Sequence, residues 1–141
     1  MIRLAVVGCV LVGFISGCAS KQVSLVEKNQ VTVVRQDSQK VNILWTDVYQ
    51  QDGQVWAYGV LEQQGSGTGA VKTHVDIQVV ALDGSVSYET ASEEVYIPCK
   101  RIGKGIHWKR FKSQLPQTLV VGSQITMTVH SGDHQPKENK S

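Results

Sequence analysis

An antiparallel β-sandwich is the fold class that the sequence predicts. Apolar and polar residues alternate with a period of two over several short segments, these segments are rich in β-branched residues, and turn signals separate them about every ten residues. Beyond the N-terminal apolar segment, no window shows a convincing helical period. The 141 residues suffice for one domain, and 41% apolar with 18% charged residues exclude a disordered chain.

The first β-prone stretch lies at residues 31–34, inside a polar segment that is rich in Gln, Ser and Lys and extends to Lys40. Two interpretations are open. The stretch adds an edge strand to a tether that lets the domain stand off a membrane surface, or it is a first strand that packs normally.

A hairpin is expected next. Residues 41–49 are rich in β-branched and aromatic side chains, and residues 54–62 form the return strand after the turn that Asp52 and Gly53 predict. Four aromatic residues lie on this hairpin: Trp45, Tyr49, Trp56 and Tyr58. They stabilise the hairpin as cross-strand pairs or form a stacking platform for sugars or peptides.

A second hairpin shows the clearest alternation. Residues 71–82 place mainly Val and Ile on one face and polar side chains on the other, and Asp83-Gly84 predicts the turn. The return strand is expected to direct Val86 and Tyr88 inward. Further strands are expected at residues 95–97, 106–115 and 124–130.

These strands define the expected domain organisation. Six to eight short strands in roughly 100 residues are typical of an immunoglobulin-like sandwich, which we expect over residues 41–131. Residues 18–40 would be the tether, and residues 132–141 a flexible polar tail. The Leu-Asp-Gly hairpin, the strand ending in Leu115-Pro116 and the last strand after a Gly-Ser turn resemble small periplasmic sandwich modules of bacteria, which implies the fold only.

Residues 1–17 predict a signal peptide. A single Arg precedes an apolar run at residues 4–15, which is well short of the ~20 residues of a spanning helix. The sequence ISGC at residues 15–18 resembles the lipobox of bacterial lipoproteins. That resemblance implies cleavage before Cys18 and acylation of Cys18, with palmitate among the acyl chains that would hold it in a membrane.

The residues after the lipobox indicate which membrane. In enterobacteria-like lipoproteins an Asp at this position retains the protein in the inner membrane, whereas this chain has Ala19-Ser20. The resemblance therefore favours the outer membrane, facing the periplasm, with the inner membrane as the alternative.

Residues 100–112 (KRIGKGIHWKRFK) carry a concentration of cations and no carboxylate. The cations are Lys100, Arg101, Lys104, Lys109, Arg110 and Lys112, and the period of two places Trp108 on one face with Arg110 and Lys112. One interpretation is a surface for an anionic partner, such as headgroups, anionic glycan or an acidic protein. The other is a solvated edge strand whose lysines discourage pairing. Nucleic acid is not an expected partner, since the net charge is only +2.

No catalytic, metal or cofactor site is expected. The chain lacks the G-x-S-x-G, Walker and H-E-x-x-H motifs. Candidate metal ligands match no standard spacing: His74, Cys99, His107, Met127, His130, Asp133 and His134. Cys99 is the one domain cysteine left once Cys18 is acylated, and it is a half-buried small apolar residue, the partner of a disulfide between chains or a redox-active free thiol.

The sequence therefore predicts a membrane-anchored, non-catalytic lipoprotein of the bacterial cell envelope. It would act as an interaction or assembly module that contacts an envelope protein complex or an anionic envelope surface. The alternative is a periplasmic carrier that binds a metal ion or an anionic glycan or lipid.

Overall fold

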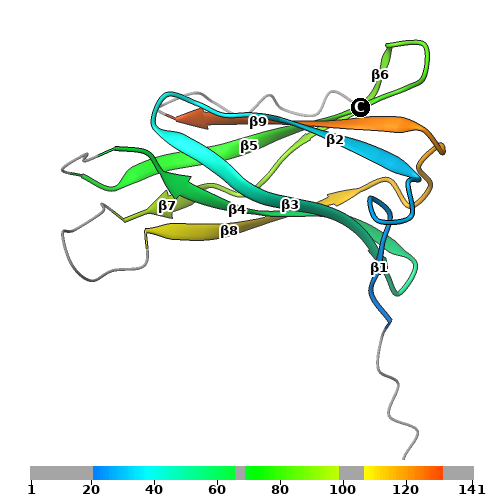
Figure 1. The fold of residues 1–141 in the computed structure, drawn as a ribbon, viewed down its shortest axis with the longest axis horizontal. Helices are drawn as coiled ribbons and strands as arrows, with labels where there is room; N and C mark the ends of the chain where they lie inside the picture. Colours follow the sequence, from blue (N-terminus) through cyan, green and yellow to red (C-terminus); the bar gives the residue numbers. More distant parts are fainter. Residues whose placement is uncertain (1–20, 66–68, 99–106, 132–141) are drawn as a thin grey trace, which may run out of the picture.

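A computed structural model describes residues 21–65, 69–98 and 107–131. These residues form nine strands in two sheets that pack face to face, so the chain is a β-sandwich (Figure 1). The fold class expected from the alternation is confirmed, and the immunoglobulin-like arrangement stays a prediction. Within the described ranges there is no helix that is long and apolar enough to cross a bilayer.

The first sheet is antiparallel throughout and has the order β1-β3-β4-β8. Its strands are β1 (Val23–Ser24), β3 (Val41–Gln51), β4 (Gln54–Gln63) and β8 (Trp108–Leu115). β3 and β4 form the expected first hairpin, with Gln51 opposite Gln54.

The second sheet contains β2 (Val31–Gln36), β9 (Ser123–Ser131), β5 (Val71–Val80) and β6 (Val86–Ala91) in that order, and β7 (Val95–Ile97) also pairs with β5. β2 runs parallel to β9, with Val31 opposite Ser123, so the expectation of an antiparallel sandwich is wrong for this pair. Alternation reveals which face a residue occupies but carries no information about strand direction, which is why the sequence did not show it.

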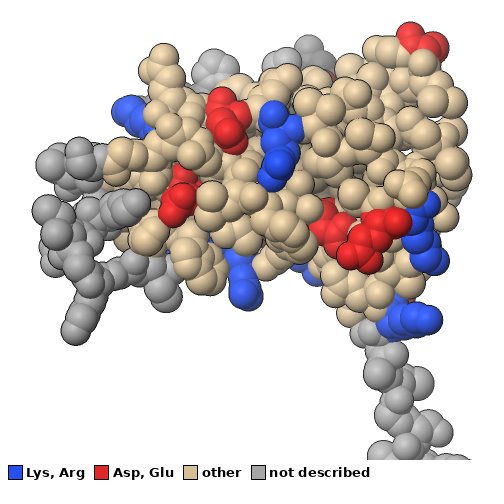
Figure 2. Space-filling view, viewed as in Figure 1, with Lys and Arg blue, Asp and Glu red and all other residues tan. Residues whose placement is uncertain are grey.

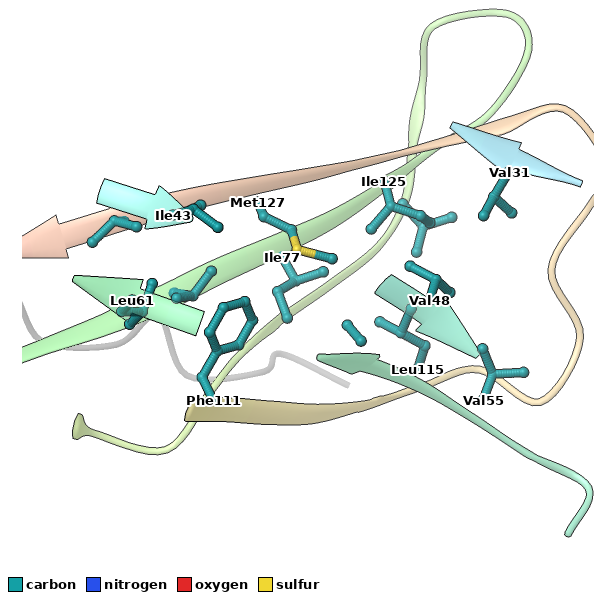
Figure 3. Close-up of a cluster of buried hydrophobic side chains, with 14 of the residues drawn as sticks. Val31, Ile43, Val48, Val55, Leu61, Ile77, Phe111, Leu115, Ile125 and Met127 are labelled. Atoms are coloured by element: carbon teal, nitrogen blue, oxygen red, sulfur yellow. The ribbon is translucent and has the colours of Figure 1, made fainter. Parts of the chain in front are cut away.

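The core lies between the inner faces of the two sheets. Figure 3 shows Leu61 and Phe111 of the first sheet directed toward Ile77 and Met127 of the second. Leu61, Ile77 and Met127 are fully inaccessible to solvent. The cluster of buried apolar side chains comprises Leu25, Val31, Val41, Ile43, Val48, Val55, Ala57, Leu61, Val75, Ile77, Val79, Ile97, Phe111, Leu115, Ile125, Met127 and Val129.

The sandwich begins earlier in the chain than residue 41. Leu25 and Val31 are buried in the core, and the Leu25 amide donates a hydrogen bond of 2.8 Å to the Val48 carbonyl. The expected tether up to Lys40 is therefore too long, because β1 and β2 belong to the sandwich. Residues 31–36 form an edge strand that also packs, so the two interpretations of this stretch are both partly right.

The inward orientation expected for Val86 is wrong. The register between β5 and β6 shifts by one residue, since Val79 lies opposite Tyr88 but Val80 lies opposite Val86. This irregularity moves Val86 to the outer face, where it is 51% exposed, while Tyr88 packs against the core as expected. The Asp-Gly turn before β6 is confirmed: Gly84 has a φ of 83°, and the Ala81 amide bonds to the Ser85 carbonyl.

Asp83 caps this second turn. Its Oδ1 accepts hydrogen bonds from the Ser85 hydroxyl at 2.6 Å and from the Ser85 amide at 2.9 Å. These bonds favour the ionised carboxylate and so lower the pKa of Asp83 below its ordinary value.

The turn of the first hairpin supports a test of backbone conformation. Asp52 and Gly53 have φ values of 51° and 76°, the left-handed pair that a two-residue turn of type I′ requires. Asp52→Val is expected to lower the free energy of unfolding by about 1–2 kcal/mol, because a β-branched side chain opposes this conformation. Asp52→Asn should be nearly neutral. Urea denaturation followed by tryptophan fluorescence measures both, and equal midpoints for the two variants would contradict the assignment.

Candidate binding surface

All three tryptophans of the chain lie on the outer face of the β1-β3-β4-β8 sheet. Along β4, buried and partly exposed residues alternate, so Trp56, Tyr58 and Val60 point away from the core. Trp45 of β3 lies opposite Val60, and Trp108 of β8 lies opposite Glu62. The solvent-facing side of such a sheet is ordinarily polar, so this concentration of aromatic rings requires an explanation.

A β-bulge in β3 adds to the apolar character of this face. The register with β4 shifts between Ile43 and Trp45, which leaves Leu44 as an extra residue without an opposite partner. Ile43 remains in the core, whereas Leu44 and Trp45 are 48% and 49% exposed. The Arg35 guanidinium donates a hydrogen bond of 3.1 Å to the Leu44 carbonyl. The bulge thus presents two adjacent large apolar side chains to solvent.

A shallow hollow of about 450 Å³ lies on this face, and we call it the aromatic hollow. Its lining consists of Leu44, Trp45, Tyr58, Val60, Trp108 and Arg110. The rings of Trp45 and Tyr58 meet edge to face, with centroids 5.5 Å apart. Arg110 is the charged group among the described residues of the lining, and its Cζ lies 5.5 Å from the centre of the Trp108 ring. The hollow therefore suits an apolar group attached to an anion.

Lys112 extends the positive charge along the same face. Its Nζ lies 3.9 Å from the centre of the Trp56 ring and 5.7 Å from that of Tyr49, both within cation–π range. Phe111 between the two cations is buried, so the expected sharing of one face by Trp108, Arg110 and Lys112 is confirmed.

The other predicted contact residues are placed differently. Lys109 is exposed, although it lies opposite the buried Leu61 and belongs to the alternate positions of β8 that otherwise face the core. Lys100, Arg101 and Lys104 lie outside the described residues, as do Cys18 and Cys99. Figure 2 shows basic and acidic side chains interspersed over the side in view, so no single-sign patch of described residues covers that side.

β8 is an edge strand, as the alternative interpretation of the basic segment supposes. The backbone N–H of Gln63 donates a hydrogen bond to the His107 carbonyl. In an antiparallel ladder only every second residue bonds to the neighbouring strand, so the backbone groups of Trp108, Arg110 and Lys112 point away from β4. Among the strands that the structure describes, the order of the sheet ends at β8. Cations at such an edge discourage pairing with a second chain. Arg110 and Lys112 therefore protect an edge and also lie over the tryptophans.

A histidine cluster lies on the outer face of the other sheet. His74 and His130 are directly opposite on β5 and β9, and their rings stack with centroids 5.4 Å apart. His130 Nε2 is 3.0 Å from Asp76 Oδ2, whereas His74 Nε2 is 3.4 Å from Oδ1 and is buried without a hydrogen bond. The carboxylate thus lies between two imidazoles, each facing a different oxygen.

The structure separates the remaining candidate metal ligands. His107 pairs with Glu62 at 2.9 Å on the first sheet, and Met127 is buried in the core. Asp133 and His134 lie outside the described residues. Within the described part of the chain, no group of three or more His, Cys, Asp or Glu side chains is arranged to hold a metal ion.

The sequence predicts the basic half of the candidate binding surface but not its aromatic half. It places Trp45 and Trp56 on the first hairpin and Trp108 in the basic segment, and it gives no link between the two. The pairing of β4 with β8 joins them. Alternation with the buried residues of β4 and β8 was the available signal for Trp56 and Trp108, whereas the outward position of Trp45 depends on the bulge. Comparison of the chain with models of protein families, with curated proteins and with solved structures finds no match.

Proposed function

We propose that the protein is a non-catalytic binding module of the bacterial cell envelope, held at a membrane by a lipid anchor on Cys18. The binding surface in this proposal is the outer face of the β3-β4-β8 region, centred on the aromatic hollow. The observation that carries it is the exposure of Leu44, Trp45 and Trp108 side by side around one hollow.

Energetics support a binding role for this surface. Clusters of large exposed apolar side chains mark interaction sites, whereas apolar side chains that are exposed singly are common on any protein surface. Tryptophan, tyrosine and arginine are also the residues that contribute most to interfaces, and the hollow contains all three types. The cation–π contacts hold Arg110 and Lys112 in place before a partner arrives, which lowers the entropy lost on binding.

The lipid anchor is supported by the ISGC sequence at residues 15–18 and the apolar run before it. Ala19-Ser20 supports the outer membrane, with the domain in the periplasm. A lipid anchor would confine the module to a thin layer at the membrane. The effective concentration of any partner in that layer would therefore be higher than for a freely diffusing domain.

Site-specific photocrosslinking in intact cells tests the binding surface. We expect a photoreactive residue at position 44 to give a discrete, reproducible crosslinked species. The matched control is position 86, because Leu44 and Val86 are 48% and 51% exposed but lie on opposite sheets. Val86 should give only background. Equal yields from both positions would contradict the assignment of the surface, whichever molecule is captured.

A further inference from the structure

We propose that the outer face of the β3-β4-β8 region rests on the surface of the membrane that holds Cys18, with anionic lipid headgroups as its partner. This inference rests on the lipid anchor proposed above. It identifies the partner of the aromatic hollow by three observations: the reach of the chain from Cys18, the residue types on the face, and the balance of its charges.

The chain between Cys18 and the first sheet is short. Four residues separate Cys18 from Val23, which pairs with Gln50 of β3, and the five Cα-to-Cα steps span at most about 17 Å when fully extended. Figure 1 shows the described chain before β1 on the side of the first sheet, away from β2, β9 and β5. An anchor on Cys18 would therefore keep the domain close to the headgroups and on the side of this sheet.

The residue types on the face match the boundary between lipid and water. Tryptophan and tyrosine concentrate at this boundary, because their rings are apolar while their N–H and O–H groups remain hydrated. Trp45 and Trp108 are 49% and 37% exposed, and the bulge adds Leu44, which is 48% exposed. These side chains could enter the headgroup layer without any change in the strands that carry them.

The charges on the face favour anionic headgroups. Arg110 and Lys112 lie over tryptophan rings, with their charged groups at the surface. The carboxylates of Glu93 and Glu94 line a neighbouring hollow together with these cations, and Glu94 is paired with Lys72. The aromatic hollow itself includes Arg110 and no carboxylate among its described residues, and basic groups near an anionic bilayer are attracted to it.

Tryptophan fluorescence tests the inference directly, because all three tryptophans lie on this face. The full chain would be produced in a host that processes lipoproteins, and its acylation at Cys18 verified by mass spectrometry. It would then be reconstituted into vesicles of phosphatidylcholine, with or without phosphatidylglycerol, containing lipids brominated in their acyl chains. We expect bromine quenching, a blue-shifted emission and protection from acrylamide, with quenching about twofold stronger when phosphatidylglycerol is present.

Variants assign the contact to the face. Leu44→Ser and Arg110→Gln should each reduce the quenching, whereas Val86→Ser, at a similar exposure on the other sheet, should leave it unchanged. Circular dichroism of each variant verifies that the β-structure is retained. Equal losses from Leu44→Ser and Val86→Ser would overturn the assignment to this face.

The possible failures are distinguishable. Tryptophans that stay open to acrylamide in an acylated, vesicle-bound chain would overturn the membrane contact and leave the anchor intact. A crosslinked protein at position 44 would then identify the occupant. Quenching that does not depend on phosphatidylglycerol would overturn the role of anionic headgroups. An unacylated Cys18, visible in the mass spectrum before any vesicle is prepared, would overturn the anchor and this inference together.

Discussion

Gly59→Ala is expected to lower the free energy of unfolding by about 1–3 kcal/mol, through overpacking of the core. Gly59 lies in the middle of β4, between Thr46 of β3 and Phe111 of β8. A Cβ at this position would lie 2.5 Å from Phe111 Cε1 and 2.7 Å from both Phe111 Cζ and the Trp45 carbonyl oxygen. The ring could rotate only into a filled core, and the carbonyl belongs to the backbone next to the bulge.

Gly69→Ala is the matched control for this substitution. Gly69 is exposed, and a Cβ there would have no heavy atom within 4 Å. It should change the stability by no more than about 0.5 kcal/mol. Urea denaturation of both variants, followed by tryptophan fluorescence, measures the difference. A Gly59→Ala variant as stable as Gly69→Ala would show that Phe111 does not pack over Gly59.

Leu61→Ala is expected to destabilise the protein by about 2–5 kcal/mol, since it opens a cavity in a closed core. Leu61 is fully inaccessible, lies opposite Ile43 in the hairpin and faces the second sheet. The lost free energy has two parts. The removed side-chain carbons no longer contribute the free energy of transfer out of water, and the surrounding side chains lose their contacts with these carbons.

Leu44→Ala removes the same atoms from a leucine that is 48% exposed, and it serves as the control for Leu61→Ala. Its effect on the free energy of unfolding should stay within about 0.5 kcal/mol. Thermal unfolding monitored by circular dichroism would compare the two. If the Leu44 variant lost as much stability as the Leu61 variant, Leu44 would have a structural role, and its assignment to the binding surface would be wrong.

Local alternation was enough to predict the fold class and most strands, since burial on one face of a strand leaves a period of two. The Asp52-Gly53 turn was equally readable, because few residues adopt two consecutive positive φ values. What the sequence did not reveal depends on distant pairing or on single insertions. The parallel contact of β2 with β9, the bulge at Leu44 and the shift that exposes Val86 belong to this class.

The candidate binding surface follows the same division. The shared face of Trp108, Arg110 and Lys112 was predictable from spacing within one strand. The contact of Lys112 with Trp56 joins residues that lie far apart in the sequence, and it arises because β8 pairs with β4. The stacking of His74 on His130 likewise needed the register of β5 and β9. Periodicity within a strand predicts which face of the sheet a residue occupies, whereas contacts between residues of different strands depend on how the strands pair.

The position of β9 in the second sheet has a consequence for the order of folding. β9 lies between β2 and β5, although it is the last strand along the described chain and β2 is among the first. Neither neighbour can complete its ladder until residues 123–131 are available, so the sheet cannot close before these residues have left the ribosome. Such late closure lengthens the interval in which the polypeptide remains unfolded. For a chain that is exported before it folds, this delay would preserve the state that a secretion channel requires.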